Sequence, residues 1–465
     1  MDDGQRPRVH FIGVCGTAMA STAVELQRCG WNVSGSDSAF YPPMSDFLSG
    51  SGIRLYQGFN AQNLPDDGLI VVGNAISRGN VELEAALDRN LLCVSLPDLI
   101  QRQFLVGRKS VVIAGTHGKT TSTALMAHIL RYAGREPGWL VGGIPNDLET
   151  PCRKGSGEVF VIEGDEYDSA WFDKRPKFLY YRPFYAGITS LEFDHSDIYA
   201  DIQAISAEFK RFAGLLPQTG RLVVNGDDRN AVDAASAARC PVVTYGLSGQ
   251  CQWRLGKFYI DKDKFWHAPC YIDNEASGEL RLKIPGRHNL MNAMLCLALA
   301  EEMGVDRQVA LEAIFSFTGV QRRLTGMRLM SNCRLYDDFA HHPTAVQAAL
   351  ETVRAMHPQA RLWALFEPRS NTMVRRFFQN ELTEALAIAD KVIIGPVHRA
   401  ASIPAEQRLD RNKIVNELKA RGIEAEYYDN YEAMAAKIKS EIRRGDVIVM
   451  MSNGAFGGIR EGLLN

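Results

Sequence analysis

Residues 110–123, "SVVIAGTHGKTTST", place an apolar run directly before a glycine-flanked turn that carries one lysine and several hydroxyls. The apolar run predicts a buried strand, and the residues after the turn predict a helix. A glycine turn that opens a helix leaves backbone N–H groups free to bind anions, and the helix dipole adds positive character there. The predicted phosphate-binding loop consists of Gly115, Thr116, His117, Gly118, Lys119, Thr120 and Thr121.

Two side chains of this loop have the chemistry that a nucleotide site needs. Lys119 can reach the outer phosphates of a nucleotide, and the Thr120 hydroxyl can ligate magnesium. The strict pattern G-x-x-x-x-G-K-[ST] would place a glycine at position 113, where this chain has Ile113, so the loop is a shortened variant. The alternative is an ordinary glycine turn with a solvated lysine. The order of strand, turn, lysine, hydroxyls and helix favours the phosphate loop.

Carboxylates and a histidine follow two further apolar runs. The stretch "VFVIEGDEYD" (159–168) predicts a strand that ends in acids, of which Glu163 is placed to ligate a magnesium ion on nucleotide phosphates. The run "FYAGITSLEFDHSDIY" (184–199) delivers Asp194 and His195 in the same manner. An acidic surface turn and a structural histidine are the alternatives. The phosphate loop one unit earlier in the chain favours a metal site.

The length of 465 residues predicts about three domains. Strand-turn-helix starts recur, and strands that alternate with helices predict mainly parallel α/β sheets. Residues 250–285 alternate apolar and polar side chains between turns, which predicts an antiparallel flank of the middle domain. The expected domains, with boundaries near Gly107 and Gly326, are residues 1–107, 108–325 and 326–465.

The composition of the chain argues against some classes of binding partner. The formal net charge of -2 gives no broad basic surface for nucleic acid or an anionic membrane. No run approaches the roughly 18 apolar residues of a membrane span, and the first residues lack the features of a signal peptide. Nine cysteines without a C-x-x-C pair are typical of reduced thiols. We therefore expect a cytoplasmic enzyme of small molecules that binds neither nucleic acid nor membrane, and the sequence leaves its oligomeric state open.

Six motifs in order resemble the Mur ligases, the ATP-dependent enzymes that form amide bonds in peptidoglycan metabolism. These motifs are "GTHGKTT", "EGDEYD", "LEFDH", "GRHNLMNAMLCLA", "GVQRRL" and "YDDFAHHPTAV". The resemblance covers essentially the whole chain. It implies a Rossmann-like N-terminal domain for a UDP-sugar, a central ATPase-type domain with a phosphate loop, and a Rossmann-like C-terminal domain for a peptide. It also implies ATP and Mg²⁺ as cofactors.

Three further stretches, "GSDSAFYPPMS", "FEPRSNTM" and "MSNGAFGGI", are similar to one branch of this family. That branch attaches a recycled tripeptide, L-alanyl-γ-D-glutamyl-meso-diaminopimelate, to UDP-N-acetylmuramate. The nearest alternative is the L-alanine-adding branch, which usually carries a "QPHR"-like segment where this chain has "FEPRSN" (366–371). More distant alternatives are a nicotinamide-dependent oxidoreductase and a non-catalytic nucleotide sensor.

The resemblance implies roles for named residues of the middle of the chain. Lys119, His195 and Arg323 are the implied catalytic residues, and Thr120, Glu163 and His195 the implied magnesium ligands. Besides the loop, the implied ATP contacts are His288, Asn289, Asn292, Arg323 and Asp338. The open alternatives are that His288 and Asn289 cap a helix, that Arg322 and Arg323 are a solvated pair, and that His341 and His342 pack before Pro343.

Two family features differ or stay open in this chain. Thr189 and Ser190 precede "LEFDH" where the family commonly carries asparagine, so this chain offers hydroxyls in place of an amide for hydrogen bonding there. Several family members carry a carbamylated lysine. Lys210 follows His195 at a spacing similar to that of this lysine, but we do not assign it a carbamylated role.

The terminal domains supply the remaining predicted contacts. "GVCGTAMA" (13–20) misses the dinucleotide fingerprint because position 18 is alanine, and the resemblance assigns its turn to a UDP-sugar diphosphate. The predicted UDP-sugar contacts are Gly13, Gly16, Thr17, Ala18, Met19, Asp37, Ser77 and Arg78, with Asn80 beside them. Arginine and amide side chains suit a peptide rich in carboxylates. The predicted peptide contacts are His341, Arg369, Ser370, Asn371 and Asn453.

Overall fold

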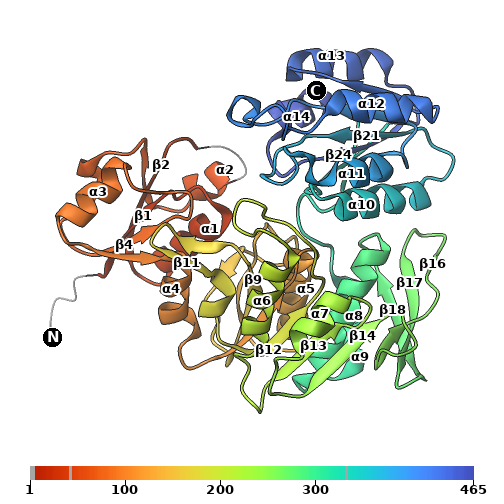
Figure 1. The fold of residues 1–465 in the computed structure, drawn as a ribbon. Coiled ribbons are helices and arrows are strands. Elements are labelled where there is room, and N and C mark those ends of the chain that lie inside the picture. Colours follow the sequence, from red (N-terminus) through yellow and green to blue (C-terminus); the bar gives the residue numbers. More distant parts are fainter. Residues whose placement is uncertain (1–5, 41–43, 330–332, 465) are drawn as a thin grey trace.

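The computed structural model describes residues 6–40, 44–329 and 333–464. The chain forms three α/β units in sequence order, each built around its own large sheet (Figure 1). This confirms the predicted fold class. The "YPP" part of the "GSDSAFYPPMS" stretch, residues 41–43, lies outside the described residues.

The N-terminal unit is a parallel five-stranded sheet in the order β3-β2-β1-β4-β5, which is Rossmann-like. Its strands are β1 (Arg8–Ile12), β2 (Asn32–Asp37), β3 (Arg54–Gln57), β4 (Leu69–Val72) and β5 (Leu92–Ser95). Its helices are α1 (Thr17–Arg28), α2 (Met44–Ser49), α3 (Val81–Asp88) and α4 (Leu96–Ile100). The glycine turn after β1 therefore opens α1 at the carboxyl edge of the sheet, where ligands of such sheets bind.

The middle unit has an eleven-stranded sheet whose central order is β14-β13-β12-β6-β9-β7. Its strands are β6 (Lys109–Ala114), β7 (Gly138–Leu140), β8 (Cys152–Arg153), β9 (Val159–Gly164), β12 (Pro183–Ile188), β13 (Arg221–Asn225), β14 (Val242–Gly246), β15 (Trp253–Leu255), β16 (Tyr259–Ile260), β17 (Trp266–Ile272) and β18 (Glu275–Leu282). A separate hairpin joins β10 (Asp168–Ala170) and β11 (Asp173–Pro176). The helices are α5 (Lys119–Tyr132), α6 (Ile202–Ala213), α7 (Arg229–Ala235), α8 (Arg287–Glu302) and α9 (Arg307–Ser316).

Both faces of the middle sheet are buried, as a parallel sheet between helices requires. Alternate residues of β6 show this. Val111 and Ile113 pack into the cluster that contains α5, α8 and α9, whereas Val112 and Ala114 pack into the cluster that contains α6 and α7. Strands β15 to β18 pair antiparallel with one another, which confirms the antiparallel flank predicted for residues 250–285.

The C-terminal unit is a six-stranded sheet in the order β19-β20-β24-β21-β22-β23. Only β19 runs antiparallel to its neighbour among the described strands of this sheet. Its strands are β19 (Thr325–Arg328), β20 (Arg334–Asp338), β21 (Leu362–Phe366), β22 (Lys391–Ile394), β23 (Glu424–Tyr427) and β24 (Val447–Met451). Its helices are α10 (Pro343–Met356), α11 (Gln379–Leu386), α12 (Arg411–Ala420), α13 (Tyr431–Glu441) and α14 (Ile459–Leu464). The boundary predicted between 325 and 326 falls inside β19.

No described helix combines the length and the apolar character that crossing a membrane requires.

The N-terminal and middle units share one continuous hydrophobic cluster. Phe104, in the segment that leads from α4 into β6, stacks on Phe160 of β9 with the ring centroids 5.7 Å apart and nearly coplanar rings. Both phenylalanines are buried. The shared core therefore fixes the first sheet against the second, while the C-terminal unit has clusters of its own.

We expect Phe104→Ala to lower the free energy of unfolding by about 3 to 5 kcal/mol, because it leaves a cavity where the two units share their core. Urea denaturation followed by tryptophan fluorescence and circular dichroism measures the change. Phe172→Ala is the matched control, because the Phe172 side chain is 44% exposed and its loss creates no cavity. Equal stabilities of the two variants would contradict the shared core.

Candidate active site

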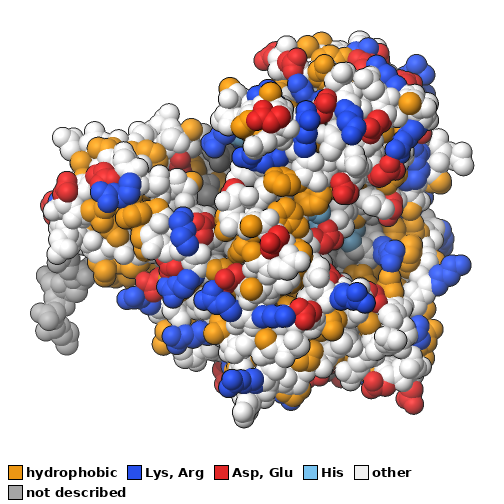
Figure 2. Space-filling model, in the orientation of Figure 1, with side chains coloured by type: hydrophobic (Ala, Val, Ile, Leu, Met, Phe, Trp, Pro, Cys, Tyr) orange, Lys and Arg blue, Asp and Glu red, His pale blue; other side chains and the backbone are white. Residues whose placement is uncertain are grey.

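A cavity of about 620 Å³ lies between the middle and C-terminal units. Figure 2 shows the hollow between these units, with histidine side chains inside it. The predicted site residues that line the cavity are Thr116, His117, Gly118, Lys119, Thr120, Thr121, Glu163, His195, His288, Asn289, Asn292, Arg323, Asp338, His341, Ser370, Asn371 and Asn453. The structure thus brings the predicted ATP, metal and peptide residues to one place, with two exceptions. Gly115, at the start of the loop, and Arg369 do not line the cavity.

The phosphate loop joins β6 to α5, and its two glycines are sterically required. Gly118 has a φ of 81°, and a Cβ there would lie 2.3 Å from Oδ1 of Asn292. Gly115 has a φ of 136°, and a Cβ there would lie 2.0 Å from Oγ1 of Thr189. Both the backbone conformation and the close packing therefore exclude larger residues.

Thr189 and Ser190 hold the loop from behind. The Thr189 hydroxyl donates a hydrogen bond to the carbonyl of His117. The His117 amide donates to Oγ of Ser190 at 3.1 Å, and the Thr116 amide donates to the Ser190 carbonyl at 2.8 Å. Hydroxyls therefore perform the hydrogen bonding at the position where the family commonly carries asparagine.

Lys119 is buried against a carboxylate that sequence analysis did not select. Its Nζ lies 2.7 Å and 2.9 Å from the two carboxylate oxygens of Glu166, and its side chain is 13% exposed. Burial alone would lower the pKa of Lys119, but the charges of Glu166, Asp165 and Glu163 outweigh it and raise the pKa. The alternative of a solvated lysine is wrong. The acids after β9 were noticed as a group, but nothing in the sequence marks Glu166 as the partner.

Thr120 and Glu163 form the oxygen-rich part of the site. The Thr120 hydroxyl donates to Oε1 of Glu163 at 3.0 Å, and Oε2 of Glu163 accepts from the Gly142 amide at 2.9 Å. The Arg323 guanidinium donates to the same Thr120 hydroxyl at 3.1 Å. Burial raises the pKa of Glu163 in spite of the nearby charges of Lys119 and Arg323. Hydroxyl and carboxylate oxygens side by side are donors that suit magnesium.

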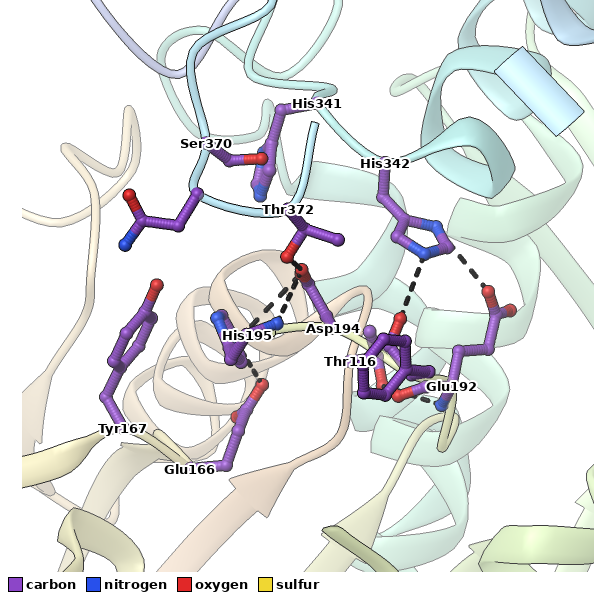
Figure 3. A network of polar contacts seen from close by, with 12 residues as sticks. Thr116, Glu166, Tyr167, Glu192, Asp194, His195, His341, His342, Ser370 and Thr372 are labelled. Atoms are coloured by element: carbon purple, nitrogen blue, oxygen red, sulfur yellow. Dashed lines mark hydrogen bonds and ion pairs between the residues drawn. The ribbon is translucent and has the colours of Figure 1, made fainter. Parts of the chain in front are cut away.

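His195 lies against Glu166 and not against Glu163 (Figure 3). Its Nε2 is 2.9 Å from Oε1 of Glu166, and its amide donates to Oδ1 of Asp194 at 2.8 Å. The φ of His195 is 57°, a left-handed conformation that is uncommon for a residue other than glycine. Burial opposes the charge on the imidazole, but Glu166 and Asp194 raise its pKa. The strained backbone holds the ring on the same carboxylate as Lys119.

The start of α8 contributes three polar side chains. The helix begins at Arg287 after Gly286, which is the N-cap residue. The alternative that His288 and Asn289 cap this helix is wrong, because both lie inside its first turn. Asn289 donates to the Pro285 carbonyl at 2.6 Å, and Asn292 donates to Oδ1 of Asn289 at 3.2 Å. The side chain of Asn292, the last of these hydrogen-bonded amides, packs against Gly118 of the phosphate loop.

Arg322 and Arg323 are not a solvated pair. Arg322 donates to the carbonyls of Ser452 and Gly454, both at 2.6 Å. Arg323 reaches Thr120, and its guanidinium carbon lies 4.9 Å from the ring centroid of Phe339. The two arginines therefore point to different units, the first to the C-terminal sheet and the second to the phosphate loop.

Asp338, at the end of β20, is buried opposite Arg323. Its carboxylate accepts from the amides of Leu324 and Ala340, each at 2.7 Å. Burial raises the pKa of Asp338 to about 6, although Arg323 and the two amides act in the opposite direction. The carboxylate fixes the segment that carries Arg323 into the C-terminal unit.

The two histidines before Pro343 have different surroundings. His341 lines the cavity, and burial lowers its pKa. His342 is buried, with its ring 4.7 Å from that of Phe378 and 4.9 Å from that of His117. Burial lowers the pKa of His342 to about 4. The alternative that these histidines are packing residues is therefore confirmed for His342. For His341 it is not the whole description, because this side chain also lines the cavity.

Hydrogen bonds join the C-terminal unit to the loop that carries His195. Oγ1 of Thr372 donates to Oδ1 of Asp194 at 2.8 Å, and Nδ2 of Asn371 donates to Oδ2 of Asp197 at the same distance. Thr372 comes from the "FEPRSNTM" stretch, directly after the predicted peptide contacts Arg369, Ser370 and Asn371. The predicted peptide loop therefore contacts the predicted metal loop.

Arg369 is held by a buried carboxylate that sequence analysis missed. Glu367, which is fully buried, accepts hydrogen bonds from the hydroxyls of Tyr431 and Ser452. Its Oε1 lies 3.7 Å from Nη1 of Arg369. A Cβ at Gly454 would lie 2.3 Å from Nε of Arg369, so the second predicted peptide loop passes closely over this arginine. A carboxylate directly after the buried strand β21 is the one sign that the sequence offered.

The predicted UDP-sugar residues lie apart from this cavity, at the carboxyl edge of the N-terminal sheet. Asp37 accepts from the amides of Cys15 and Ser38, both at 2.8 Å. Arg78 forms a two-pronged ion pair with Glu84, both distances being 2.9 Å. Asn80 caps α3 by accepting from two backbone amides. The turns after β1 and β4 adjoin, since a Cβ at Gly13 would lie 3.3 Å from Ile76.

Comparison with protein families matches all three units. The family models that match are the Mur ligase family catalytic domain over residues 8–105, the Mur ligase middle domain over 113–300, and the Mur ligase glutamate ligase domain over 322–454. A curated protein of Escherichia coli strain K12, UDP-N-acetylmuramate–L-alanyl-γ-D-glutamyl-meso-2,6-diaminoheptandioate ligase, is 36% identical over 461 residues, 98% of each chain. The chain belongs to the Mur ligase family. It is therefore a ligase, and the alternative of an oxidoreductase is wrong.

Two further relatives bear on the branch of this Mur ligase. The crystal structure of a murein peptide ligase from Psychrobacter arcticus 273-4 is similar with a TM-score of 0.75 and 31% identity, and covers 98% of each chain. The UDP-N-acetylmuramate–L-alanine ligase of Paenarthrobacter aurescens strain TC1 is 36% identical over 467 residues, covering 97% of this chain and 96% of its own. The chain is thus about equally identical in sequence to members of the tripeptide-adding and the L-alanine-adding branches.

Asp338 gives this Mur ligase a testable pH dependence. Because the folded pKa of about 6 lies above the usual 3.8, the folded chain holds this proton more tightly than the unfolded chain does. The contribution is fully present below about pH 4 and is lost as the pH rises through about 6, by up to about 3 kcal/mol. The difference in unfolding free energy between wild type and Asp338→Asn should fall over this range. A difference that is constant from pH 4 to 7 would contradict the raised pKa.

Proposed function

We propose that this Mur ligase joins the tripeptide L-alanyl-γ-D-glutamyl-meso-diaminopimelate to UDP-N-acetylmuramate at the expense of ATP, in peptidoglycan recycling. The supporting relatives are the tripeptide ligase of Escherichia coli and the murein peptide ligase of Psychrobacter arcticus. The observation that carries the proposal is the joint anchoring of the loops "FEPRSNTM" and "MSNGAFGGI" by Glu367. Both loops resemble the tripeptide branch, and Glu367 ties Arg369 of the first to Ser452 of the second.

The reaction needs activation because a carboxylate is a poor acylating agent. The lactyl carboxylate of UDP-N-acetylmuramate attacks the γ-phosphorus of ATP, so an acyl phosphate forms and ADP leaves. The amine of the tripeptide then attacks the acyl carbon, and the C–O bond to phosphate breaks. The amine loses a proton, and the products are the amide, ADP and inorganic phosphate. The protein contributes mainly positioning and neutralisation of charge.

The loop amides and Lys119 hold the phosphates, and Arg323 approaches the same place from the opposite side of Thr120. Asn289, Asn292 and His288 line the cavity beside the loop, where the base and ribose of ATP fit. Lys119 is already desolvated and paired with Glu166, so phosphate oxygens compete with a carboxylate and not with bulk water. Arg323 is stacked on Phe339, which limits its motion.

The donors at the cavity fit a magnesium ion. Thr120 and Glu163 offer oxygen ligands that are in contact with each other. His195 offers a ring nitrogen, which lies against the carboxylate of Glu166. Thr120 and Glu163 would hold such an ion, and it would supply positive charge that offsets the charge of the phosphates. We assign Thr120 and Glu163 to the ion and His195 to a second ligand position.

The other substrates occupy the outer units. The adjoining turns after β1 and β4 hold the UDP-sugar diphosphate, with Gly13, Gly16, Thr17, Ala18 and Met19 in the first turn. Asp37, Ser77 and Arg78 contact the rest of the sugar nucleotide, and His341, Arg369, Ser370, Asn371 and Asn453 contact the tripeptide. All partners are small molecules, and the proposed compartment is the cytoplasm.

Product analysis tests the substrate. UDP-N-acetylmuramate, ATP and magnesium are supplied with either free L-alanine or the free tripeptide, and mass spectrometry measures the products. We expect the mass of the tripeptide adduct, with one phosphate released per amide formed. An L-alanine adduct alone would assign the chain to the other branch.

Lys119→Ala tests catalysis against the alternative of a nucleotide sensor. We expect the rate of adduct formation to fall at least 100-fold, because a preorganised charge on the transferred phosphoryl group is lost. Lys174→Ala is the control, since the Lys174 side chain is 70% exposed on the hairpin β10–β11. A variant at position 119 that forms product at the wild-type rate would remove the assigned role of the loop.

Glu367→Gln tests the positioning of Arg369. The variant keeps hydrogen-bonding atoms for Tyr431 and Ser452 but removes the charge that faces the guanidinium. We expect KM for the tripeptide to rise about 10-fold while KM for ATP stays unchanged, because about 1.4 kcal/mol of binding corresponds to tenfold. Glu381→Gln, an exposed residue of α11, is the matched control. Equal changes in both KM values would indicate a general structural defect instead.

A further inference from the structure

Three side chains with metal-binding donors meet at the edge of the cavity. His117 comes from the phosphate loop, Glu192 from the segment after β12, and His342 from the residue before α10. Their donor atoms all lie within 4.8 Å of one another. Nε2 of His117 is 3.5 Å from Oε2 of Glu192. Nδ1 of His342 is 3.6 Å from the same oxygen, and Figure 3 shows this second contact. The group therefore converges on one point from two units of the fold.

The contacts of His342 leave one of its nitrogens unsatisfied. The residue is 4% exposed, and Nδ1 has no hydrogen-bond partner among the described residues. Nε2 lies 3.3 Å from the carbonyl of Phe193, which accepts the ring proton when it is on this nitrogen. The lone pair of Nδ1 then faces the carboxylate of Glu192. Because His342 is buried, its unsatisfied lone pair facing a carboxylate is unfavourable unless a cation lies between the two groups.

The surrounding hydrogen bonds are those that support a metal ligand. Histidine ligands usually donate their second ring N–H to a carbonyl or carboxylate, as Nε2 of His342 does toward Phe193. Ligating carboxylates are themselves hydrogen-bonded, and the Thr344 hydroxyl donates to Oε2 of Glu192 at 2.6 Å. Both supports are present without an ion, so the donors are already oriented.

The donor set selects the class of metal. Two imidazoles and one carboxylate, with a fourth position open, is a set that binds zinc. Tetrahedral bonds of 2.0–2.1 Å place donors about 3.4 Å apart, close to the two distances observed here. Magnesium prefers oxygen ligands, so this group differs in kind from the pair of Thr120 and Glu163.

We propose that His117, Glu192 and His342 form a binding site for a transition-metal ion of the zinc class, separate from the magnesium site. The ion links the phosphate loop to the first helix of the C-terminal unit. Bound zinc therefore stabilises the arrangement in which these two units are together. The proposal does not depend on which substrate the ligase uses.

The test is zinc binding by the full-length, chelator-treated protein without nucleotide or magnesium. Competition with a chromophoric chelator measures the affinity, and we expect one high-affinity ion per chain. Glu192→Gln and His342→Ala should each weaken that affinity at least 10-fold, since even supporting groups of metal sites are worth about 10- to 100-fold. Zinc should also raise the thermal unfolding midpoint of the wild type but not of Glu192→Gln. Cobalt(II) should give the visible absorption of a four-coordinate ion in the wild type only.

Control variants separate this site from its neighbours. His357→Ala removes a histidine at the other end of α10 that bonds to Tyr336, and we expect no change in affinity. Glu163→Gln and His195→Ala remove the magnesium donors and should also retain zinc. Equal affinity in wild type, Glu192→Gln and His342→Ala would overturn the proposal, as would loss of zinc only in Glu163→Gln or His195→Ala. If His342→Ala does not fold, the near-isosteric Glu192→Gln decides, with circular dichroism as the check on folding.

Discussion

The active site depends on one buried ion pair, that of Lys119 with Glu166. An ammonium group that is 13% exposed would lose its proton or leave the cavity without a carboxylate partner. Glu166 supplies that partner and holds His195 with one of the same oxygens. Carboxylates exceed cations around this point, since Glu163, Asp165 and Asp194 also line the cavity. A bare triphosphate would meet this negative charge, whereas a magnesium nucleotide brings its own compensation. This excess of carboxylates suits the magnesium nucleotide that we propose as the substrate form.

The same contacts that shape the phosphate loop also link it to the rest of the molecule. Thr189 and Ser190 fix the loop to the middle sheet, and Asn292 fixes it to α8. Arg323 reaches Thr120 from the segment that Asp338 anchors in the C-terminal unit. Thr372 bonds to Asp194, one residue from His195. Separation of the C-terminal unit would remove Arg323 and the support of the His195 loop together. The contacts that hold these two units together are therefore also contacts that complete the site.

The sequence predicted elements and residue types well, and pairings poorly. Strand-turn-helix order gave the α/β class, and alternation gave the antiparallel flank, because both are local patterns. Motif order placed Lys119, Thr120 and Glu163 at one cavity with Arg323 and Asp338, which come much later in the chain. It could not pair Lys119 with Glu166 among four nearby acids, since that choice depends on side-chain direction at the end of β9. It also could not find Glu367 or distinguish His342 from His341, because burial in this place comes from contacts between separate units. The hypothesis that His288 caps the helix was wrong because Gly286, with a φ of 113°, is the N-cap residue, and the helix already begins at Arg287.

The choice between an amino acid and a tripeptide must be made away from the reacting atoms. Either amine attacks the same acyl carbon, so the phosphate loop, the proposed magnesium donors and Arg323 serve both branches equally. Similar overall identity to both branches is the expected result. What differs is how far the substrate extends beyond its amine. An extended tripeptide reaches about 10 Å, at roughly 3.3–3.6 Å per residue. Ser370 and Asn371 line the cavity, whereas Arg369 lies outside its lining, against Glu367 and the loop at Gly454. A cation beside the lining, and not part of it, suits a carboxylate that lies farther from the amine than that of free alanine. The position of Arg369, and not the catalytic apparatus, therefore favours the longer substrate.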